Sequence, residues 1–443
     1  MILNFIIYLS VSLGIGCNKE IPPTPIPIPP TPIPIPPTPC LYGLCDTSKL
    51  NLVWQVPLSK DTAEIGSKKA LLFNGNVLFT EEQASETLNM LDGKTGAFVW
   101  NWSDYIVNGR TSITGNGAGA NGIIHKDNQI LINAWNEIYS MNAQDGRTTW
   151  KYQTPFNIEG HPRFKIIGEE LYHVHEPVIN KKTVKSTLVK SRINQAIWNP
   201  VFSQDSFGKY EPSLETPNKW ISPEGHEILI FQARFIDFSF SNNSPDLIDV
   251  VGYDTQDKKE YFRFKNIDSL NMSGSTKTAF ILNNKAYMPL QNRIVCIDLL
   301  SKSILWYKKM NPGVGFSSGN PFIFVENKLF LKPDDRVLYQ INPDTGAEIW
   351  VDKDNGSGCS DMVYHKGLLY YTCSGNGKIY AVEVATGKKI WAEPSPNKFP
   401  NAMNGNRRRS NANIGSGGVA KDSTLGYLYT SDYYFGICLK LPK

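Results

Sequence analysis

Three histidines form the clearest grouping of side chains that could bind a metal ion. His173 and His175 are two residues apart in a stretch that reads as a β-strand, so their imidazoles leave the same face. His161 lies on the preceding strand, roughly opposite them if the chain turns near Gly168-Glu169, and Glu176 follows directly. Three imidazoles beside a carboxylate can hold a transition metal. The alternative is that strand pairing has brought unrelated histidines together.

A second group of residues could bind a ligand or a partner. Arg407, Arg408 and Arg409 concentrate positive charge in an Asn- and Gly-rich loop, and guanidinium groups match carboxylates or phosphates. The long segment 199–251 is rich in aromatic residues, which include Phe202, Phe207, Tyr210, Trp220 and Phe238. A solvent-exposed Trp220 would favour binding of a glycan or another surface ligand there. The alternatives are a solvated loop for the arginines and additional core for the aromatic residues.

Two cysteine pairs are candidates for disulfides in an oxidising compartment. Cys40 and Cys45 flank the short segment Leu-Tyr-Gly-Leu and could close a small loop. Cys359 and Cys373 lie on the two arms of an expected hairpin that turns near Lys366-Gly367, almost opposite each other if the turn is tight. Each pair could equally remain reduced.

The N-terminus reads as an export signal for a lipoprotein. Residues 1–16 contain an apolar stretch, from Phe5 to Ile15, that is too short to span a bilayer and ends in small residues. The segment 13–17 resembles a bacterial lipobox, which implies that Cys17 is lipidated after cleavage. Because Asp after the lipidated cysteine typically marks retention in the inner membrane, Asn18 at that place implies the outer membrane. An ordinary secretory signal with an incidental cysteine is the alternative.

A tether and a folded region follow the signal. We expect residues 17–45 to form a tether, since 21–39 is a Pro-Thr-Pro-Ile repeat with the composition of polyproline II. The net charge of +4 over 443 residues is far from the concentrated basic surface that nucleic-acid binding needs, so we exclude that class of function.

An internal repeat organises the rest of the chain. A hydrophobic residue followed by Asp or Asn, a turn with Gly, and an aromatic residue recurs at one spacing in units that end at Trp100, Trp150, Trp198, Phe262, Trp306, Trp350 and Trp391. The Asp or Asn can bond its own backbone, and Gly supplies the positive φ of a hairpin bulge. A second hairpin precedes each of these. Four antiparallel strands about every 45 residues are typical of a propeller blade.

The two ends of the chain complete the count of blades. The last three strands, near 417–421, 425–431 and 436–441, lack a fourth. Residues 51–56, with Trp54, repeat the missing strand, so we expect the N- and C-terminal strands to close one shared blade, the eighth. Cys296 and Cys438 occupy equivalent positions in two repeats, where we expect small buried residues rather than a disulfide.

The repeat resembles that of the pyrroloquinoline-quinone-like, quinoprotein-type propellers over residues 46–443. The resemblance implies an all-β, eight-bladed propeller of four-stranded antiparallel blades. It also implies that the tryptophan of each blade packs flat against the neighbouring blade, which makes these tryptophans structural.

The resemblance also allows an enzyme hypothesis to be tested against the residues. Quinone-dependent dehydrogenases of this fold carry an adjacent Cys-Cys disulfide, a Glu-Asn-Asp calcium set and a catalytic Asp. This sequence has no adjacent cysteines and no acidic cluster that can be placed at the mouth of the propeller. We therefore predict a protein that is not an enzyme, with no cofactor and with no catalytic or metal site.

The combination of lipobox, size and blade number resembles the propeller lipoprotein of the outer-membrane β-barrel assembly machinery. This implies a scaffold that binds envelope proteins and faces the periplasm or the cell surface. Capture of a glycan or another surface ligand is the alternative, and a quinone-dependent dehydrogenase is a third hypothesis.

Overall fold

A computed structural model of the whole chain divides into two units, Met1–Leu41 and Tyr42–Lys443. All residues that the structure describes lie in the second unit, and they are 51–58, 70–80, 88–102, 123–134, 137–153, 164–179, 182–193, 195, 197–237, 246–270, 278–290, 293–310, 321–353, 355–394, 419–432 and 435–442. The expected signal peptide (1–16) and tether (17–45) are outside this set.

The regular elements of the described residues are all β-strands. This part of the chain contains no helix with the length and apolar character that a membrane crossing requires. The all-β prediction is therefore confirmed.

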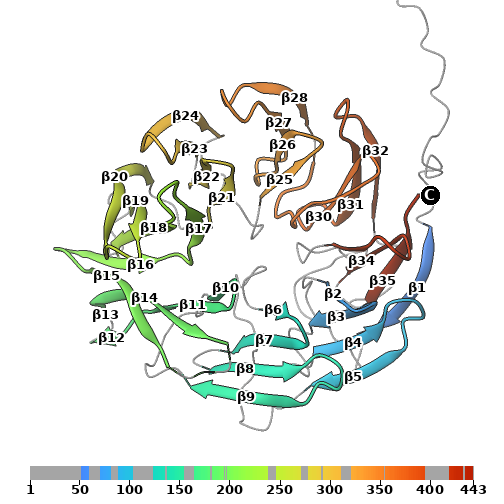
Figure 1. Cartoon of the computed structure of the whole chain (residues 1–443). Coiled ribbons are helices and arrows are strands. Elements are labelled where there is room, and N and C mark those ends of the chain that lie inside the picture. The colour runs from blue at the N-terminus through green and yellow to red at the C-terminus, as the bar shows by residue number, and fades with distance from the viewer. Residues whose placement is uncertain are drawn as a thin grey trace, which may run out of the picture. The chain divides into compact units, whose positions relative to one another are not determined.

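The strands form eight antiparallel blades arranged in a ring (Figure 1), which we number along the chain. Blades 1 and 2 contain β2 (Leu71–Phe73), β3 (Asn76–Thr80), β4 (Leu88–Asp92) and β5 (Phe98–Trp102), then β6 (Ile123–Lys126), β7 (Gln129–Ala134), β8 (Glu137–Asn142) and β9 (Thr148–Gln153). Blade 3 contains β10 (Phe164–Ile167), β11 (Glu170–His175), β14 (Lys185–Arg192) and β15 (Asn199–Asp205), with a small hairpin of β12 (Val178–Ile179) and β13 (Lys182–Thr183) between β11 and β14.

Blades 4 to 8 repeat this order. Blade 4 contains β16 (Tyr210–Leu214), β17 (Asn218–Ile221), β18 (Glu227–Asp237), β19 (Asp246–Asp254) and β20 (Lys259–Leu270), and blade 5 contains β21 (Phe280–Leu282), β22 (Lys285–Pro289), β23 (Arg293–Asp298) and β24 (Ser303–Lys309). Blade 6 contains β25 (Phe322–Val325), β26 (Lys328–Leu331), β27 (Leu338–Ile341) and β28 (Glu348–Asp352), and blade 7 contains β29 (Val363–His365), β30 (Leu368–Cys373), β31 (Lys378–Glu383) and β32 (Lys389–Pro394). Blade 8 joins β33 (Ala420–Asp422), β34 (Tyr427–Ser431) and β35 (Phe435–Lys440) to β1 (Leu52–Pro57).

The two ends of the described chain close the ring, as the sequence predicts. In blade 8, β35 lies between β34 and β1 (Figure 1). Trp54 is the Cα partner of Cys438, and Leu52 is the partner of Leu439. The eighth blade is therefore shared by strands from opposite ends of the sequence.

The hairpin between the third and fourth strands has the structure that its spacing predicts. The Asp92 carboxylate accepts a hydrogen bond from the backbone N–H of Thr95 at 2.7 Å, and Gly96 has a φ of +75°. A Cβ atom on Gly96 would lie only 2.9 Å from the indole of Trp54, so that ring packs on the turn of the next blade. The same contact joins Trp100 to Gly146, Trp306 to Gly346 and Trp350 to Gly387. These contacts confirm the expected packing of tryptophans on neighbouring blades.

The third strand carries a cysteine opposite the aromatic ring in two blades. Cys296 is the Cα partner of Trp306, as Cys438 is of Trp54, and a register shift follows in each case. Both cysteines are buried and neither forms a disulfide. Their equivalent places in the repeat are confirmed.

One aromatic assignment in the repeat was wrong. In blade 3 the residue at the register shift, opposite Leu188, is Phe202 and not Trp198. Phe202 packs on Phe231 of blade 4 with ring centroids 5.1 Å apart, whereas Trp198 lies 5.2 Å from Tyr152 of blade 2. The count failed because the hairpin from Leu188 to Phe202 spans four residues more than its equivalents, such as the hairpin from Met90 to Trp100.

Blade 4 accounts for the length of segment 199–251. Both β16 and β17 pair with β18, in registers that differ by one residue on either side of Pro217. Proline has no N–H to donate to the ladder, so the innermost strand is interrupted there. The aromatic segment is thus the last strand of blade 3 followed by an enlarged blade 4, which is the alternative that the sequence left open.

The topology defines two faces of the propeller. Since successive strands are antiparallel, the first-to-second connections of the blades and the third-to-fourth connections of blades 1 to 7 lie on one face, which we call the turn face. The second-to-third connections and those between blades lie on the other, which we call the loop face.

Candidate functional site

Several residues singled out in the sequence lie outside the described residues. These are the lipidation candidate Cys17, the pair Cys40 and Cys45, the histidine His161, the aromatic residue Phe238, and Arg407, Arg408 and Arg409. Their proposed roles stay predictions.

Trp220 is not available as an exposed binding platform. Its side chain is 5% exposed, lies in the core between blades 4 and 5, and donates from Nε1 to Oδ1 of Asn284 at 3.2 Å. An exposed Trp220 would have favoured the glycan hypothesis, so this placement counts against it. The residue instead supplies packing for the interrupted inner strand.

A disulfide joins Cys359, in the connection from blade 6 to blade 7, to Cys373 at the end of β30. The two residues face each other across an antiparallel bridge, and the hairpin between them turns at Lys366 and Gly367, both of which have positive φ. The backbone N–H of Gly375 also donates to the Ser357 carbonyl at 2.9 Å. This connection on the loop face is therefore fixed to blade 7.

Lys332, just after β26 in blade 6, also holds the connection between blades 6 and 7 in place. The residue is 1% exposed, and its Nζ donates to the carbonyls of Pro333 at 2.7 Å and Gly356 at 3.2 Å. Burial lowers the pKa of the Lys332 ammonium to about 8, although the nearby Asp335 and Asp334 favour its charged form. The buried ammonium therefore opposes folding while it is protonated.

This pKa predicts a rise in stability in alkaline solution. The pKa of Lys332 is lower in the folded chain than in the unfolded chain, where it is 10.5, so the unfolded chain binds more protons between pH 8 and 10.5. The free energy of unfolding should therefore rise across this window by about 2–3 kcal/mol relative to a Lys332→Met variant. Urea unfolding at several pH values measures the difference.

The exposed Lys353 supplies the control for that measurement. A Lys353→Met variant should show the same pH profile as the wild type. Parallel profiles for the wild type and Lys332→Met would contradict the assignment of the buried ammonium.

His173 and His175 lie together on β11, as predicted. Their ring centroids are 4.8 Å apart, and the ring of Trp198 lies 5.5 and 5.7 Å from them. Burial keeps the pKa of His173 well below its usual range and lowers that of His175 to about 4. Both imidazoles are therefore neutral at pH 7, which is the form that binds metal ions.

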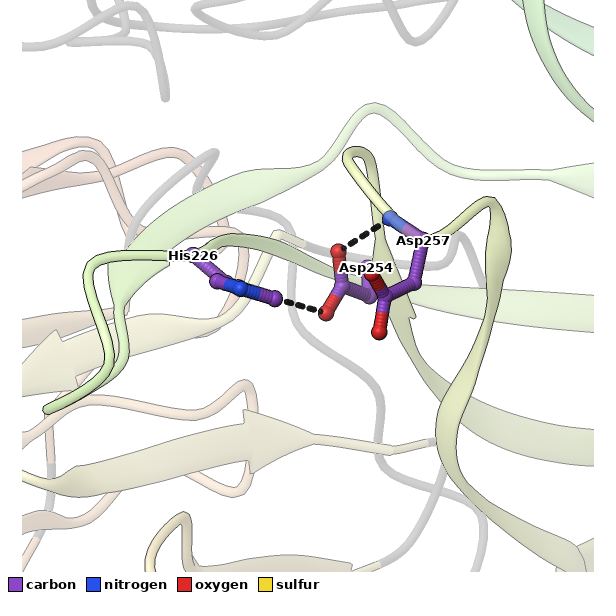
Figure 2. Close-up of side chains that lie close together, drawn as sticks. All are labelled: His226, Asp254 and Asp257. Carbon is purple, nitrogen blue, oxygen red and sulfur yellow. Dashed lines mark hydrogen bonds and ion pairs between the residues drawn. The ribbon is translucent and has the colours of Figure 1, made fainter.

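Another group of side chains that could hold a metal ion lies on the turn face of blade 4 (Figure 2). His226, Asp254 and Asp257 offer ligand atoms within 4.8 Å of one another. Asp254 accepts hydrogen bonds from His226 Nδ1 at 2.7 Å and from the backbone N–H of Asp257 at 2.9 Å, and Asp257 pairs with Lys259. The hydrogen bond to Asp254 raises the pKa of His226. The three side chains thus already stabilise a turn of the repeat.

The sequence did not reveal Lys332 or His226. Lys332 is buried by two connections that are more than twenty residues apart in sequence, which no local pattern shows. His226 meets Asp254 because β18 pairs with β19, and Ile228 is the Cα partner of Asp254. Asp254 could be recognised as the Asp of the repeat. Its contact with His226 could not be predicted, because the sequence did not show where β18 begins.

Three exposed apolar side chains lie on neighbouring segments of the loop face, between blades 3 and 4. Ile179, Val184 and Phe207, which we call the blade 3–4 patch, are 55%, 36% and 46% exposed. The N–H of Ser206 donates to the Val184 carbonyl at 3.0 Å, so the two segments are in contact. Exposed apolar groups gathered on loops are typical of protein-binding surfaces.

Comparison with protein families gives one clear match. The profile described as outer membrane protein assembly factor BamB matches residues 44–165 and 250–428, roughly two thirds of the chain. The unmatched residues between them hold most of blades 3 and 4, including the blade 3–4 patch. No curated protein matches the chain.

Solved structures share the fold at low sequence identity. BamB from Moraxella catarrhalis is 10% identical, with a TM-score of 0.52 over 88% of this chain and 98% of that one. The computationally designed protein Ika8 is 11% identical, with a TM-score of 0.55 over 88% of this chain and 100% of that one. Quinohemoprotein alcohol dehydrogenase from Comamonas testosteroni is 10% identical, with a TM-score of 0.59 over 89% of this chain and 76% of that one.

Proposed function

This chain belongs to the family of the outer membrane protein assembly factor BamB, and on that premise we propose that it is a non-enzymatic scaffold that binds another protein of the cell envelope. The family match carries the proposal, because it covers blades 1 and 2, blades 5 to 7 and part of blade 8. The structural likeness to BamB from Moraxella catarrhalis supports the fold alone.

We place the protein-binding surface on the loop face at the blade 3–4 patch. The patch lies in the segment that the family profile does not match, so it differs from the common framework. Its apolar side chains are exposed to solvent, whereas many other apolar side chains of blades 3 and 4 form a buried cluster. A partner that covers Phe207 and Val184 would remove this apolar surface from water.

The proposal includes an anchor at Cys17 in the outer membrane. The signal peptide 1–16, the tether 17–45 and the propeller 46–443 would then place the scaffold away from the lipid surface, facing either the periplasm or the exterior. Metabolic labelling with a fatty acid, compared between the wild type and a Cys17→Ser variant, tests the anchor.

The redox alternative has less support. Dehydrogenases are among the structures that share the fold, but at 10% identity that likeness carries no function. The chain has no adjacent cysteines, and the one disulfide among the described residues joins cysteines 14 residues apart. The adjacent pair typical of the quinone enzymes is therefore missing from the sequence.

Site-specific photo-crosslinking in intact cells tests the scaffold. A photoreactive amino acid in place of Phe207 should capture a protein of the envelope assembly machinery, which mass spectrometry can identify. Phe98 is the matched control, because it is 49% exposed, close to the 46% of Phe207, but lies on the outer strand of blade 1. Equal capture from both positions, or capture of polysaccharide alone from Phe207, would overturn the proposal.

A further inference from the structure

The two histidines of β11 face a buried interface between blades 2 and 3. His173 and His175 share the face of the strand that carries Leu171, and Leu171 packs with Leu131 and Ile138 of blade 2. Phe164 of the neighbouring strand is the Cα partner of His173 and belongs to the same cluster. The imidazoles therefore contact apolar and aromatic groups on this side.

His173 has an unmet requirement for a polar partner. Its side chain is completely buried, and neither Nδ1 nor Nε2 has a hydrogen-bond partner among the described residues. A neutral imidazole carries one N–H donor and one lone pair, and leaving such groups unpaired in the interior is unfavourable. A bound species that meets this requirement is therefore expected.

Trp198 is a second unusual residue at the interface between blades 2 and 3. It does not perform the packing role of the repeat, which Phe202 takes in this blade. Its ring lies between Tyr152 of blade 2 and the two histidines, with ring centroids 5.2, 5.5 and 5.7 Å away. Among the described residues, His175 is the one titratable group that acts on His173, so no carboxylate is placed to pair with the imidazole.

We propose that His173 and His175 bind one divalent transition-metal ion of the zinc type between blades 2 and 3, with solvent or an external ligand in the remaining positions. Two imidazoles that bind one tetrahedral ion, each with its nitrogen about 2.0–2.1 Å away, have ring centroids roughly 5 Å apart. The observed separation is 4.8 Å, and the rings are inclined by 72°. Nitrogen ligands without a neighbouring charge suit zinc, cobalt, nickel or copper rather than calcium or magnesium.

The site is distinct from the acidic arrangement of His226, Asp254 and Asp257. That cluster contains two carboxylates, both of which already have partners, and lies on the turn face. An experiment must therefore separate the two locations. The metal site does not depend on the proposed binding of a partner protein.

Metal titration of the purified full-length chain tests the proposal. After dialysis against a chelator, the wild type should bind one Zn²⁺ and should gain thermal stability in its presence, because an ion that binds the folded state alone stabilises it. Co²⁺ in the same site should give the visible absorption of a cobalt ion with nitrogen ligands. His173→Asn and His175→Asn should each weaken Zn²⁺ binding at least about tenfold.

His226→Asn is the matched control, and it should leave Zn²⁺ binding unchanged. Since His173 is buried and its variant could unfold, circular dichroism of each variant accompanies the titration, and His175→Asn provides the second reading. The proposal is overturned if the folded wild type binds no Zn²⁺. It is equally overturned if both β11 variants keep the affinity, or if His226→Asn alone abolishes it.

Discussion

A chain that ends at Asp432, and so lacks β35, is expected to aggregate rather than fold. In blade 8, β35 is hydrogen-bonded to β34 on one side and to β1 on the other. Ile437 and Leu439 pack in the cluster with blade 7, whereas Cys438 packs in the cluster with blade 1. Each fully buried aliphatic side chain contributes about 1.5–3 kcal/mol, and domains are stable by only about 5–15 kcal/mol. Loss of this strand therefore removes a large share of the total stability and opens the ring.

Solubility, gel filtration and protease resistance of the truncated chain measure the effect. The control ends at Pro442 and loses only Lys443, so it keeps the hydrogen bond between His365 and the Pro442 carbonyl and should fold. A positive test of closure uses Pro57→Cys with Phe435→Cys, since these residues are Cα partners across β1 and β35. A new disulfide should form in the full chain. Its absence, or a soluble monomer from the truncated chain, would show that the ends do not share a blade.

The sequence predicted the fold because the repeat is local. The turn from Asp92 to Trp100 contains its own hydrogen bonds, its positive φ and its aromatic residue within nine positions, so reading it required no long-range information. The same reading failed at Trp198, where a hairpin four residues longer moved the aromatic position to Phe202. Spacing therefore identified the blades reliably but did not identify every residue that packs between them.

The candidate sites were less visible, because they combine distant segments. The approach of Cys359 to Cys373 followed from a hairpin and was within reach of the sequence. The shared face of His173 and His175 followed from strand alternation, but their isolation from charge depends on how blade 2 packs against them. The burial of Lys332 depends on the connection that follows β28. Side chains that need two blades to define their surroundings cannot be assessed from one strand.

The contact between Trp100 and Gly146 should be the strongest single link between two neighbouring blades that mutation can test. Trp100 is buried and donates from Nε1 to the Ala143 carbonyl at 3.0 Å. Replacing it with alanine should reduce the free energy of unfolding by about 3–5 kcal/mol, because the variant leaves a cavity and an unpaired carbonyl. Denaturant unfolding followed by circular dichroism measures the loss.

Gly146→Ala should be destabilising for two separable reasons. Its φ of +72° is unfavourable for a residue with a Cβ, which costs roughly 1–2 kcal/mol, and that Cβ would lie 2.7 Å from the Trp100 ring, which adds about 1–3 kcal/mol of overpacking. Gly75→Ala isolates the first cost, since Gly75 has a φ of +81° and no atom within 4 Å of the added Cβ. The two glycine variants should therefore differ by the cost of the clash.

A double-mutant cycle of Trp100→Ala and Gly146→Ala then distinguishes direct contact from independent damage. If the indole lies on Gly146, the added methyl group meets empty space once the ring is gone, so only the backbone cost remains. The double variant should be more stable than the sum of the single effects predicts, by about 1–3 kcal/mol. Strict additivity would mean that the ring does not touch the turn of the next blade, and the repeated tryptophans would then not be the residues that link one blade to its neighbour.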